Sequence, residues 1–143
     1  MFKKATKEKL KLRLLIEGAS GSGKTFSALT MARNFGKKIA VIDTEKGSAS
    51  LYSDKFNFDV CELLPPYTPE KYIQLIKFAE SQNYDVILID SITHEWAGAG
   101  GCLDLQAQLG GRYQDWAKVT PRHNAFIEAI LQSSAHVIAC ART

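Results

Sequence analysis

Five short apolar runs punctuate the chain, and each is followed by polar residues. They predict β-strands at residues 12–17, 38–42, 58–64, 85–90 and 136–140. Apolar runs of this length, with few polar interruptions, are typical of strands that pack between two layers. The first run, L-R-L-L-I-E, is therefore expected to be buried on both faces.

The segments between these runs carry apolar residues at helical spacing. A helix over residues 24–34 is expected to bury one face, formed by Phe26, Ala28, Leu29, Met31 and Ala32. A second helix should begin at T-P-E (68–70), a capping residue followed by proline and an acid. It should end near residue 81, and its expected buried side holds Ile73, Ile76, Phe78 and Ala79.

A third helix is expected from Pro121 to about residue 132. Between residues 97 and 111 the pattern is less regular, with glycine breaks at both ends, and Leu103, Leu105 and Leu109 fit either a short helix or an ordered loop. Strands that alternate with helices predict βαβ units with right-handed crossovers. The fold class is therefore α/β with a mainly parallel sheet.

The composition is that of one globular domain of 143 residues, 45% of them hydrophobic. The net charge of +3 is too small to indicate nucleic-acid binding by itself. Near the N-terminus Glu8 is outnumbered by Lys3, Lys4, Lys7, Lys9 and Lys11. We therefore divide the chain into a basic arm (1–11) and a core (12–143), the arm being either a solvated terminus or a contact for nucleic acid.

Three scattered cysteines, Cys61, Cys102 and Cys140, suit a reducing compartment, and we expect the protein in the cytoplasm. They form no C-x-x-C pair and no His/Cys metal spacing, which argues against a zinc site. No apolar run approaches the roughly 20 residues that a membrane-spanning helix needs. A membrane partner is therefore not expected.

Residues 18–25 read G-A-S-G-S-G-K-T and follow the first predicted strand directly. This is the phosphate-loop pattern G-x-x-x-x-G-K-[ST], placed between a strand and a helix. Its glycines permit tight turns and close approach of backbone N–H groups to phosphates, and the following helix directs its N-terminus at them. The residues expected to contact a bound nucleotide are Gly18, Ala19, Ser20, Gly21, Ser22, Gly23, Lys24, Thr25 and Phe26.

Polar clusters follow three strands: D-T-E (43–45), D-S (90–91) and R-T (142–143). Ligands of parallel sheets bind at the carboxyl ends of strands, so these clusters should converge on the phosphate loop. Asp90, fixed by the preceding V-I-L-I, is expected to hold Mg²⁺ together with Thr25. The alternative for Asp90 is a helix cap, and Ser91 is left open between these two roles.

Hydrolysis also needs a group that orients and deprotonates water. Many related ATPases place a Glu directly after the metal-binding Asp, where this chain has Ser91. We assign the role to Glu45 rather than Glu95, which is expected on a helix that points away. Lys24 and Arg142 are the expected cations at the γ-phosphate. The competing interpretations place Glu45 in a solvent-exposed loop and Arg142 on the surface.

Three further side chains receive structural assignments. Trp96 is expected in the core or in an interface. His94 and His123 lack partners at metal spacing and are interpreted as ordinary surface or loop residues.

The motifs V-I-D-T-E (41–45) and V-I-L-I-D-S (86–91) resemble the RecA-type ATPase core. That resemblance maps the water-activating acid onto Glu45. Over most of its length the chain more closely resembles phage-encoded RecA-like AAA-type nucleotide-binding proteins, which are associated with recombination and single-strand annealing. The motifs that carry this resemblance are D-S-I-T-H-E-W (90–96), W-A-K-V-T-P-R-H-N (116–124) and H-V-I-A-C-A-R-T (136–143).

The resemblance implies a three-layer P-loop sandwich that hydrolyses ATP with Mg²⁺, forms a homo-oligomeric ring or filament, and binds single-stranded DNA in the host cytoplasm. Two departures stand out. Cys140 occupies the polar γ-phosphate sensor position, so that role is expected to pass to Arg142 or to residues beyond Thr143. The later strands of a full RecA core are missing, which indicates C-terminal truncation. Residues 97–122 replace the DNA-contacting loops and carry only three basic residues, Arg112, Lys118 and Arg122.

Two other functions fit the phosphate loop. A small-molecule P-loop kinase would need an arginine-rich lid, and residues 97–122 are poor in arginine. A non-catalytic nucleotide-binding module would bind ATP without turnover. Hydrolysis of ATP is the interpretation that best accounts for the polar strand ends.

Overall fold

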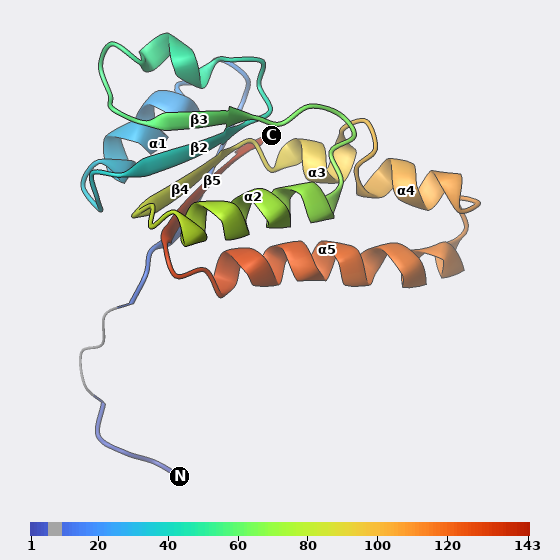
Figure 1. Ribbon diagram of the computed structural model, residues 1–143. Coiled ribbons are helices and arrows are strands. Elements are labelled where there is room, and N and C mark those ends of the chain that lie inside the picture. The colour runs from blue at the N-terminus through green and yellow to red at the C-terminus, as the bar shows by residue number, and fades with distance from the viewer. Residues whose placement is uncertain (6–9) are drawn as a thin grey trace.

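The computed structural model describes residues 1–5 and 10–143; Lys7, Glu8 and Lys9 of the expected basic arm lie outside the described residues. The core is a five-stranded sheet in which every neighbouring pair of strands is parallel (Figure 1). Across the sheet the strands follow the order β1 (Arg13–Gly18), β5 (His136–Arg142), β4 (Val86–Asp90), β2 (Ile39–Asp43) and β3 (Asp59–Glu62). The predicted parallel α/β fold is confirmed.

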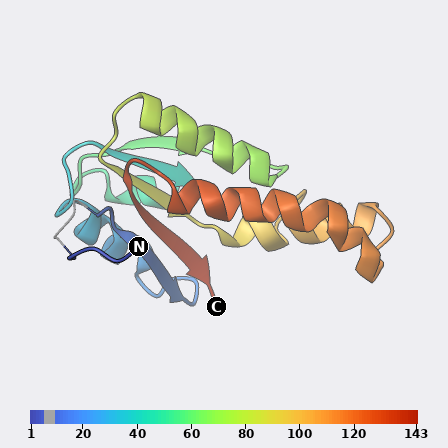
Figure 2. The same ribbon diagram turned by 90° about the horizontal axis from the view of Figure 1, so that it is seen from below.

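Helices cover both faces of this sheet. Successive side chains of β4 point to opposite faces, as a strand requires. Val86 and Leu88 join the apolar cluster around α1, whereas Ile87 and Ile89 join the cluster beneath α2 and α5. Figure 2 shows α2 and α5 side by side across the second face. These layers form a three-layer sandwich, with α1 (Lys24–Ala32) on one face and α2 (Pro69–Ser81) and α5 (Trp116–Leu131) on the other.

Two short helices, α3 (Thr93–Ala97) and α4 (Cys102–Gln108), follow β4 and extend past the carboxyl edge of the sheet (Figure 1). The choice left open for residues 97–111 is thereby decided in favour of a short helix. Two 3₁₀ turns, η1 (Ala49–Tyr52) and η2 (Tyr113–Asp115), complete the connections. Within residues 1–5 and 10–143, no helix combines the length and the apolar character that crossing a membrane requires.

Burial differs from the sequence-based expectation at three places. The first strand is not buried on both faces, because β1 lies at the edge of the sheet and Leu15 is 50% exposed. The expected apolar faces of the first two helices were too wide: Phe26 and Met31 of α1 are partly exposed, and Phe78 of α2 is 62% exposed. The exposure of β1 follows from strand order, which has no local sequence signal.

The last helix begins earlier than predicted, at Trp116, so that Pro121 lies inside α5. A proline in a helix removes one hydrogen bond, here the one to the carbonyl of residue 117. The preceding turn fixes the true start: Asp115 Oδ2 accepts hydrogen bonds from Arg112 N at 2.9 Å and Nε at 3.1 Å. The prediction that this helix begins at Pro121 was therefore wrong.

The start of α2 matches its prediction, since Thr68 is the N-cap and accepts a hydrogen bond from Lys71 N at 3.4 Å. We expect Thr68→Ala to lower the free energy of unfolding by about 1 kcal/mol, because one backbone N–H of the first turn loses its partner. Urea unfolding followed by circular dichroism measures the change. Thr120→Ala, at an exposed position inside α5, is the matched control and should leave the midpoint unchanged or slightly raised. Equal destabilisation of both variants would contradict the capping role.

Candidate nucleotide-binding site

The phosphate loop links β1 to α1 and has the backbone geometry of an anion cradle. Gly21 and Gly23 adopt φ angles of 78° and 91°, in the left-handed region that favours glycine. A Cβ at Gly18 would lie 2.6 Å from Ser22 Oγ, so a larger residue at this position would require the Ser22 side chain to move. Gly23 is the N-cap of α1, and the unpaired N–H groups of that helix therefore face the loop.

A cleft of about 310 Å³ opens beside this loop at the carboxyl ends of β2, β4 and β5. It is a polar site whose walls come from four separate segments of the chain. The lining residues are Ser20, Gly21, Gly23, Lys24, Thr25, Glu45, Ser48, Leu51, Tyr52, Asp90 and Arg142. Residues that are far apart in the sequence, from Ser20 to Arg142, thus line the same cleft.

Not every residue proposed for nucleotide contact lines this cleft. Gly18, Ala19 and Ser22 belong to the loop but do not line the cleft, and the Ala19 carbonyl accepts a hydrogen bond from Lys24 Nζ at 3.0 Å. The ring of Phe26 packs instead against Tyr52 and Phe56, with centroids 5.8 and 5.5 Å away. Phe26 therefore supports the wall of the cleft from outside.

Thr25 and Asp90 meet directly. The Thr25 hydroxyl donates a 2.7 Å hydrogen bond to Asp90 Oδ2, and Asp90 is only 1% exposed. Burial raises the pKa of Asp90; the hydrogen bond from Thr25 opposes the rise, and the charge of Glu45 adds to it. A buried carboxylate beside a hydroxyl and a phosphate cradle is a set of hard oxygen donors, which fits Mg²⁺.

The loop after β2 is held by its own first residue. Asp43 accepts hydrogen bonds from the backbone N–H groups of Glu45 and Gly47, both at 2.7 Å. Asp43 is itself 1% exposed, so the turn is anchored inside the protein. This anchoring places Glu45 at the rim of the cleft rather than in a free loop.

Glu45 and Arg142 form an ion pair across the cleft. Arg142 Nε lies 3.1 Å from Glu45 Oε1, and Arg142 Nη2 donates to Glu45 Oε2. Burial acts to raise the pKa of Glu45, but hydrogen bonds from Arg142 and Ser91 and the charge of Arg142 outweigh it, so the pKa lies below its ordinary value. The acid and the cation proposed for the γ-phosphate are thus partners in this structure.

A second network ties the end of β2 to the end of β4. Thr44 N donates to the Asp90 carbonyl at 2.7 Å, and Ser91 N donates to Thr44 Oγ1 at 2.9 Å. His94 Nδ1 lies 2.8 Å from the same hydroxyl oxygen. The interpretation of His94 as an ordinary surface residue was therefore wrong: it joins the framework behind Asp90.

Sequence reasoning missed the contribution of residues 47–57, which supply Ser48, Leu51 and Tyr52 to the cleft. The segment reads as a polar loop, and its two aromatic residues, Tyr52 and Phe56, are the local signal that it packs against the protein. Cys140, at the expected sensor position, is fully buried beside Asp90 on the neighbouring strand. It faces the apolar core and does not line the cleft.

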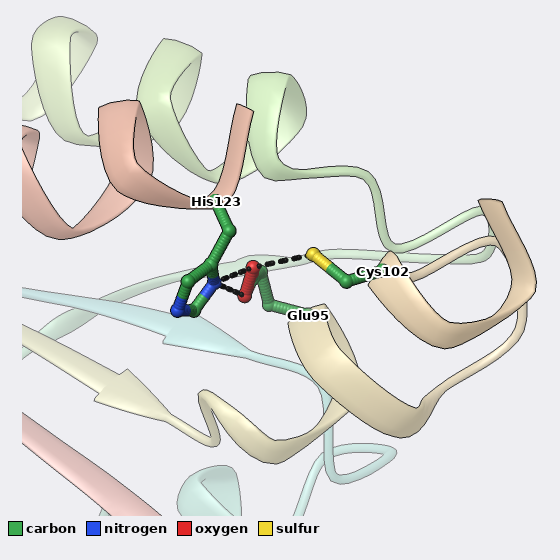
Figure 3. A group of neighbouring side chains, drawn as sticks. All are labelled: Glu95, Cys102 and His123. Carbon is green, nitrogen blue, oxygen red and sulfur yellow. Dashed lines mark hydrogen bonds and ion pairs between the residues drawn. The ribbon is translucent and has the colours of Figure 1, made fainter. Parts of the chain in front are cut away.

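Glu95, the rejected candidate for the water-activating acid, lies on α3 with its side chain turned away from the cleft. It contacts Cys102 and His123 instead (Figure 3). Trp96 stacks on Trp116 with 5.4 Å between ring centroids. The prediction that His123 is an ordinary surface or loop residue was wrong, because its ring nitrogen bonds a buried carboxylate.

Comparison with known families agrees with this geometry. A family model described as an AAA domain matches residues 10–143. The chain belongs to the AAA domain family. AAA domains as a class are nucleotide-binding ATPases, and the phosphate loop and buried acid of this AAA domain accord with that class. No curated protein matches the chain significantly.

Proposed function

We propose that this AAA domain binds ATP with Mg²⁺ in the cleft and hydrolyses the bond to the γ-phosphate. The observation that supports this most strongly is convergence. A phosphate loop, a buried acid bonded to the loop threonine, and an acid–cation pair all face one cleft of about 310 Å³. Each comes from a different strand end, where ligands of parallel sheets bind.

The loop backbone and Lys24 would hold the phosphates, and Thr25 and Asp90 would hold Mg²⁺. Mg²⁺ supplies neutralisation of the charge that develops on the phosphate oxygens. Asp90 suits this task because its carboxylate is buried beside other acids, which raises its pKa and favours a cation nearby. The Thr25 hydroxyl is hydrogen-bonded to Asp90 Oδ2, so the two oxygen donors proposed for Mg²⁺ already lie side by side.

Glu45 would orient the attacking water and accept its proton. Its present partner, Arg142, lowers its basicity. Because a terminal phosphate is also an anion, it would compete with Glu45 for the guanidinium of Arg142. We infer that binding of ATP draws Arg142 toward the phosphate and frees Glu45 for water.

The same ion pair favours a second candidate, a non-catalytic nucleotide-binding module. If Arg142 stays bound to Glu45, the acid remains a weak base and ATP is held without turnover. Turnover of purified protein with Mg²⁺ separates the two functions. ATP binding without hydrolysis at any protein concentration would favour the module.

We expect Asp90→Asn to lower Mg²⁺-dependent ATP turnover at least about 100-fold, comparable with the loss of one preorganised electrostatic group. The amide keeps the shape and a hydrogen bond to Thr25 but loses the charge that attracts the cation. Phosphate release measured against Mg²⁺ concentration tests this. Asp54→Asn, an exposed loop acid, is the control and should match the wild type. Unchanged turnover in Asp90→Asn would remove Asp90 from the metal site.

For the biological context, we propose a phage-type RecA-like protein that acts in DNA recombination or single-strand annealing, as a ring or filament on single-stranded DNA. This proposal rests on the resemblance of sequence motifs. The basic residues of segment 97–122 add little support for DNA binding, because Arg112 pairs with Asp115 and Arg122 pairs with Glu70. Tyr113, 91% exposed, offers a face on which a base can stack.

Single-stranded DNA is the informative addition to the turnover assay. Stimulation that grows with protomer concentration and weakens with salt would support an oligomer on DNA. Turnover that is indifferent to DNA and to protein concentration would contradict this context while leaving ATP hydrolysis intact.

A further inference from the structure

Three side chains that take no part in the cleft meet between α3, α4 and α5 (Figure 3). Cys102 Sγ lies 3.0 Å from Glu95 Oε1, and His123 Nδ1 lies 2.6 and 3.0 Å from the two oxygens of Glu95. One potential ligand atom from each residue falls within 4.8 Å of the others. Glu95 is 1% exposed and Cys102 is fully buried.

The backbone brings these groups together by close packing at glycine. A Cβ at Gly101 would lie 2.6 Å from the carbonyl oxygens of both His94 and Glu95. Only glycine therefore lets the start of α4 approach the end of α3 this closely. Cys102, the first residue of α4, is thereby placed against Glu95. The juxtaposition is built into the chain path and does not depend on a chance rotamer.

We propose that Glu95, Cys102 and His123 form a zinc site, separate from the nucleotide cleft. Zinc binds thiolate sulfur, imidazole nitrogen and carboxylate oxygen, and three protein ligands leave a fourth position for water or another donor. Tetrahedral bonds of about 2.0–2.3 Å place ligand atoms roughly 3.5 Å apart. The three donor atoms lie within 4.8 Å of one another, so small side-chain adjustments would bring them to this spacing.

The donor set selects zinc over the magnesium expected at the nucleotide. Sulfur and imidazole are poor ligands for Mg²⁺ and good ligands for Zn²⁺. One carboxylate and one thiolate also balance the charge of the divalent ion. Zinc binds the thiolate form of cysteine, so zinc binding would release the thiol proton of Cys102 to solvent.

The proposed zinc site is accessible from solvent on the side of His123. The side chain of His123 is 29% exposed, whereas that of Glu95 is 1% exposed. An ion can therefore enter past the imidazole, and a water molecule can complete the coordination there. Bound zinc would join α3, which follows Asp90 directly, to α4 and α5 in one rigid unit.

Cobalt substitution tests the site in the complete chain. Protein purified with a chelator should bind one Co²⁺ per chain and show a thiolate-to-cobalt charge-transfer band and tetrahedral visible bands, which Zn²⁺ then removes. Zinc should also raise the melting temperature, since an ion that binds only the folded state stabilises it. Failure of the wild-type chain to bind either ion stoichiometrically would overturn the proposal and leave a hydrogen-bonded cluster.

Two cysteine variants distinguish the site from incidental metal binding. Cys102→Ser should abolish the charge-transfer band and weaken zinc binding by at least about 100-fold. Mutation of a residue that only orients a metal ligand costs up to about 100-fold in affinity, and loss of a ligand itself should cost at least as much. Cys61→Ser, at the exposed cysteine of β3, should retain both. His123→Gln, at a partly exposed position, tests a second ligand without touching the core and should also weaken zinc binding. Tight binding that survives Cys102→Ser and His123→Gln would overturn the assignment.

Discussion

Lys24→Ala is expected to abolish measurable ATP turnover, with a loss of at least about 100-fold. Lys24 is the side-chain cation of the phosphate loop; it lines the cleft, and its ammonium donates a hydrogen bond to the Ala19 carbonyl at 3.0 Å. Removing it leaves the phosphate loop without its side-chain cation. A charged hydrogen bond contributes about 1.5–3 kcal/mol, so ATP affinity should fall roughly 10–100-fold as well.

Calorimetric titration with a non-hydrolysable ATP analogue measures the affinity, and phosphate release measures the turnover. Lys37→Ala, an exposed lysine between α1 and β2, is the matched control. Its affinity and turnover should equal those of the wild type. Equal affinities for the Lys24→Ala and wild-type proteins would show that phosphates do not bind at the loop, and the site proposal would fail.

Glu45→Gln should lower turnover by about 100–10,000-fold, the range for loss of a general base, while ATP still binds within about threefold of the wild type. Glutamine keeps the size of the side chain and one oxygen for Arg142, but it cannot accept a proton. The ion pair becomes a neutral hydrogen bond, which leaves Arg142 freer to meet a phosphate. Binding and hydrolysis should therefore separate in this variant.

Glu62→Gln provides the comparison, because Glu62 ends β3, the strand beside β2, and is exposed outside the cleft. Its turnover should match the wild type. If Glu45→Gln hydrolyses ATP at the wild-type rate, another group activates water. If it loses binding as well as turnover, Glu45 has a structural role at the loop after β2.

Sequence patterns predicted the features that have local causes. The run V-I-L-I-D forms β4 because uninterrupted apolar residues suit a central strand, and Thr68 with Pro69 starts α2 because the first turn needs a capping oxygen. Asp90 was expected near Thr25 because parallel strands end at a common edge. The structure places a 2.7 Å hydrogen bond between them.

Features that depend on tertiary neighbours escaped prediction. The partial exposure of β1 follows from its edge position, and the wall supplied by Tyr52 follows from the path of a polar loop. The cluster at Glu95 has no spacing motif, since its partners lie 7 and 28 residues away in sequence. Its members come together because three helices pack past the sheet edge, and no single helix encodes that arrangement.

The strand order also has a consequence for how the protein is synthesised. In the described sheet β1 pairs only with β5, which occupies an interior position although it is the last of the five strands in sequence order. A nascent chain shorter than residue 136 therefore carries its phosphate loop on a strand with no partner. Long-range pairing of this kind delays folding and exposes strand edges meanwhile. Acquisition of nucleotide binding should thus wait for the synthesis of β5, which makes ATP a late-acting stabiliser of the newly made domain.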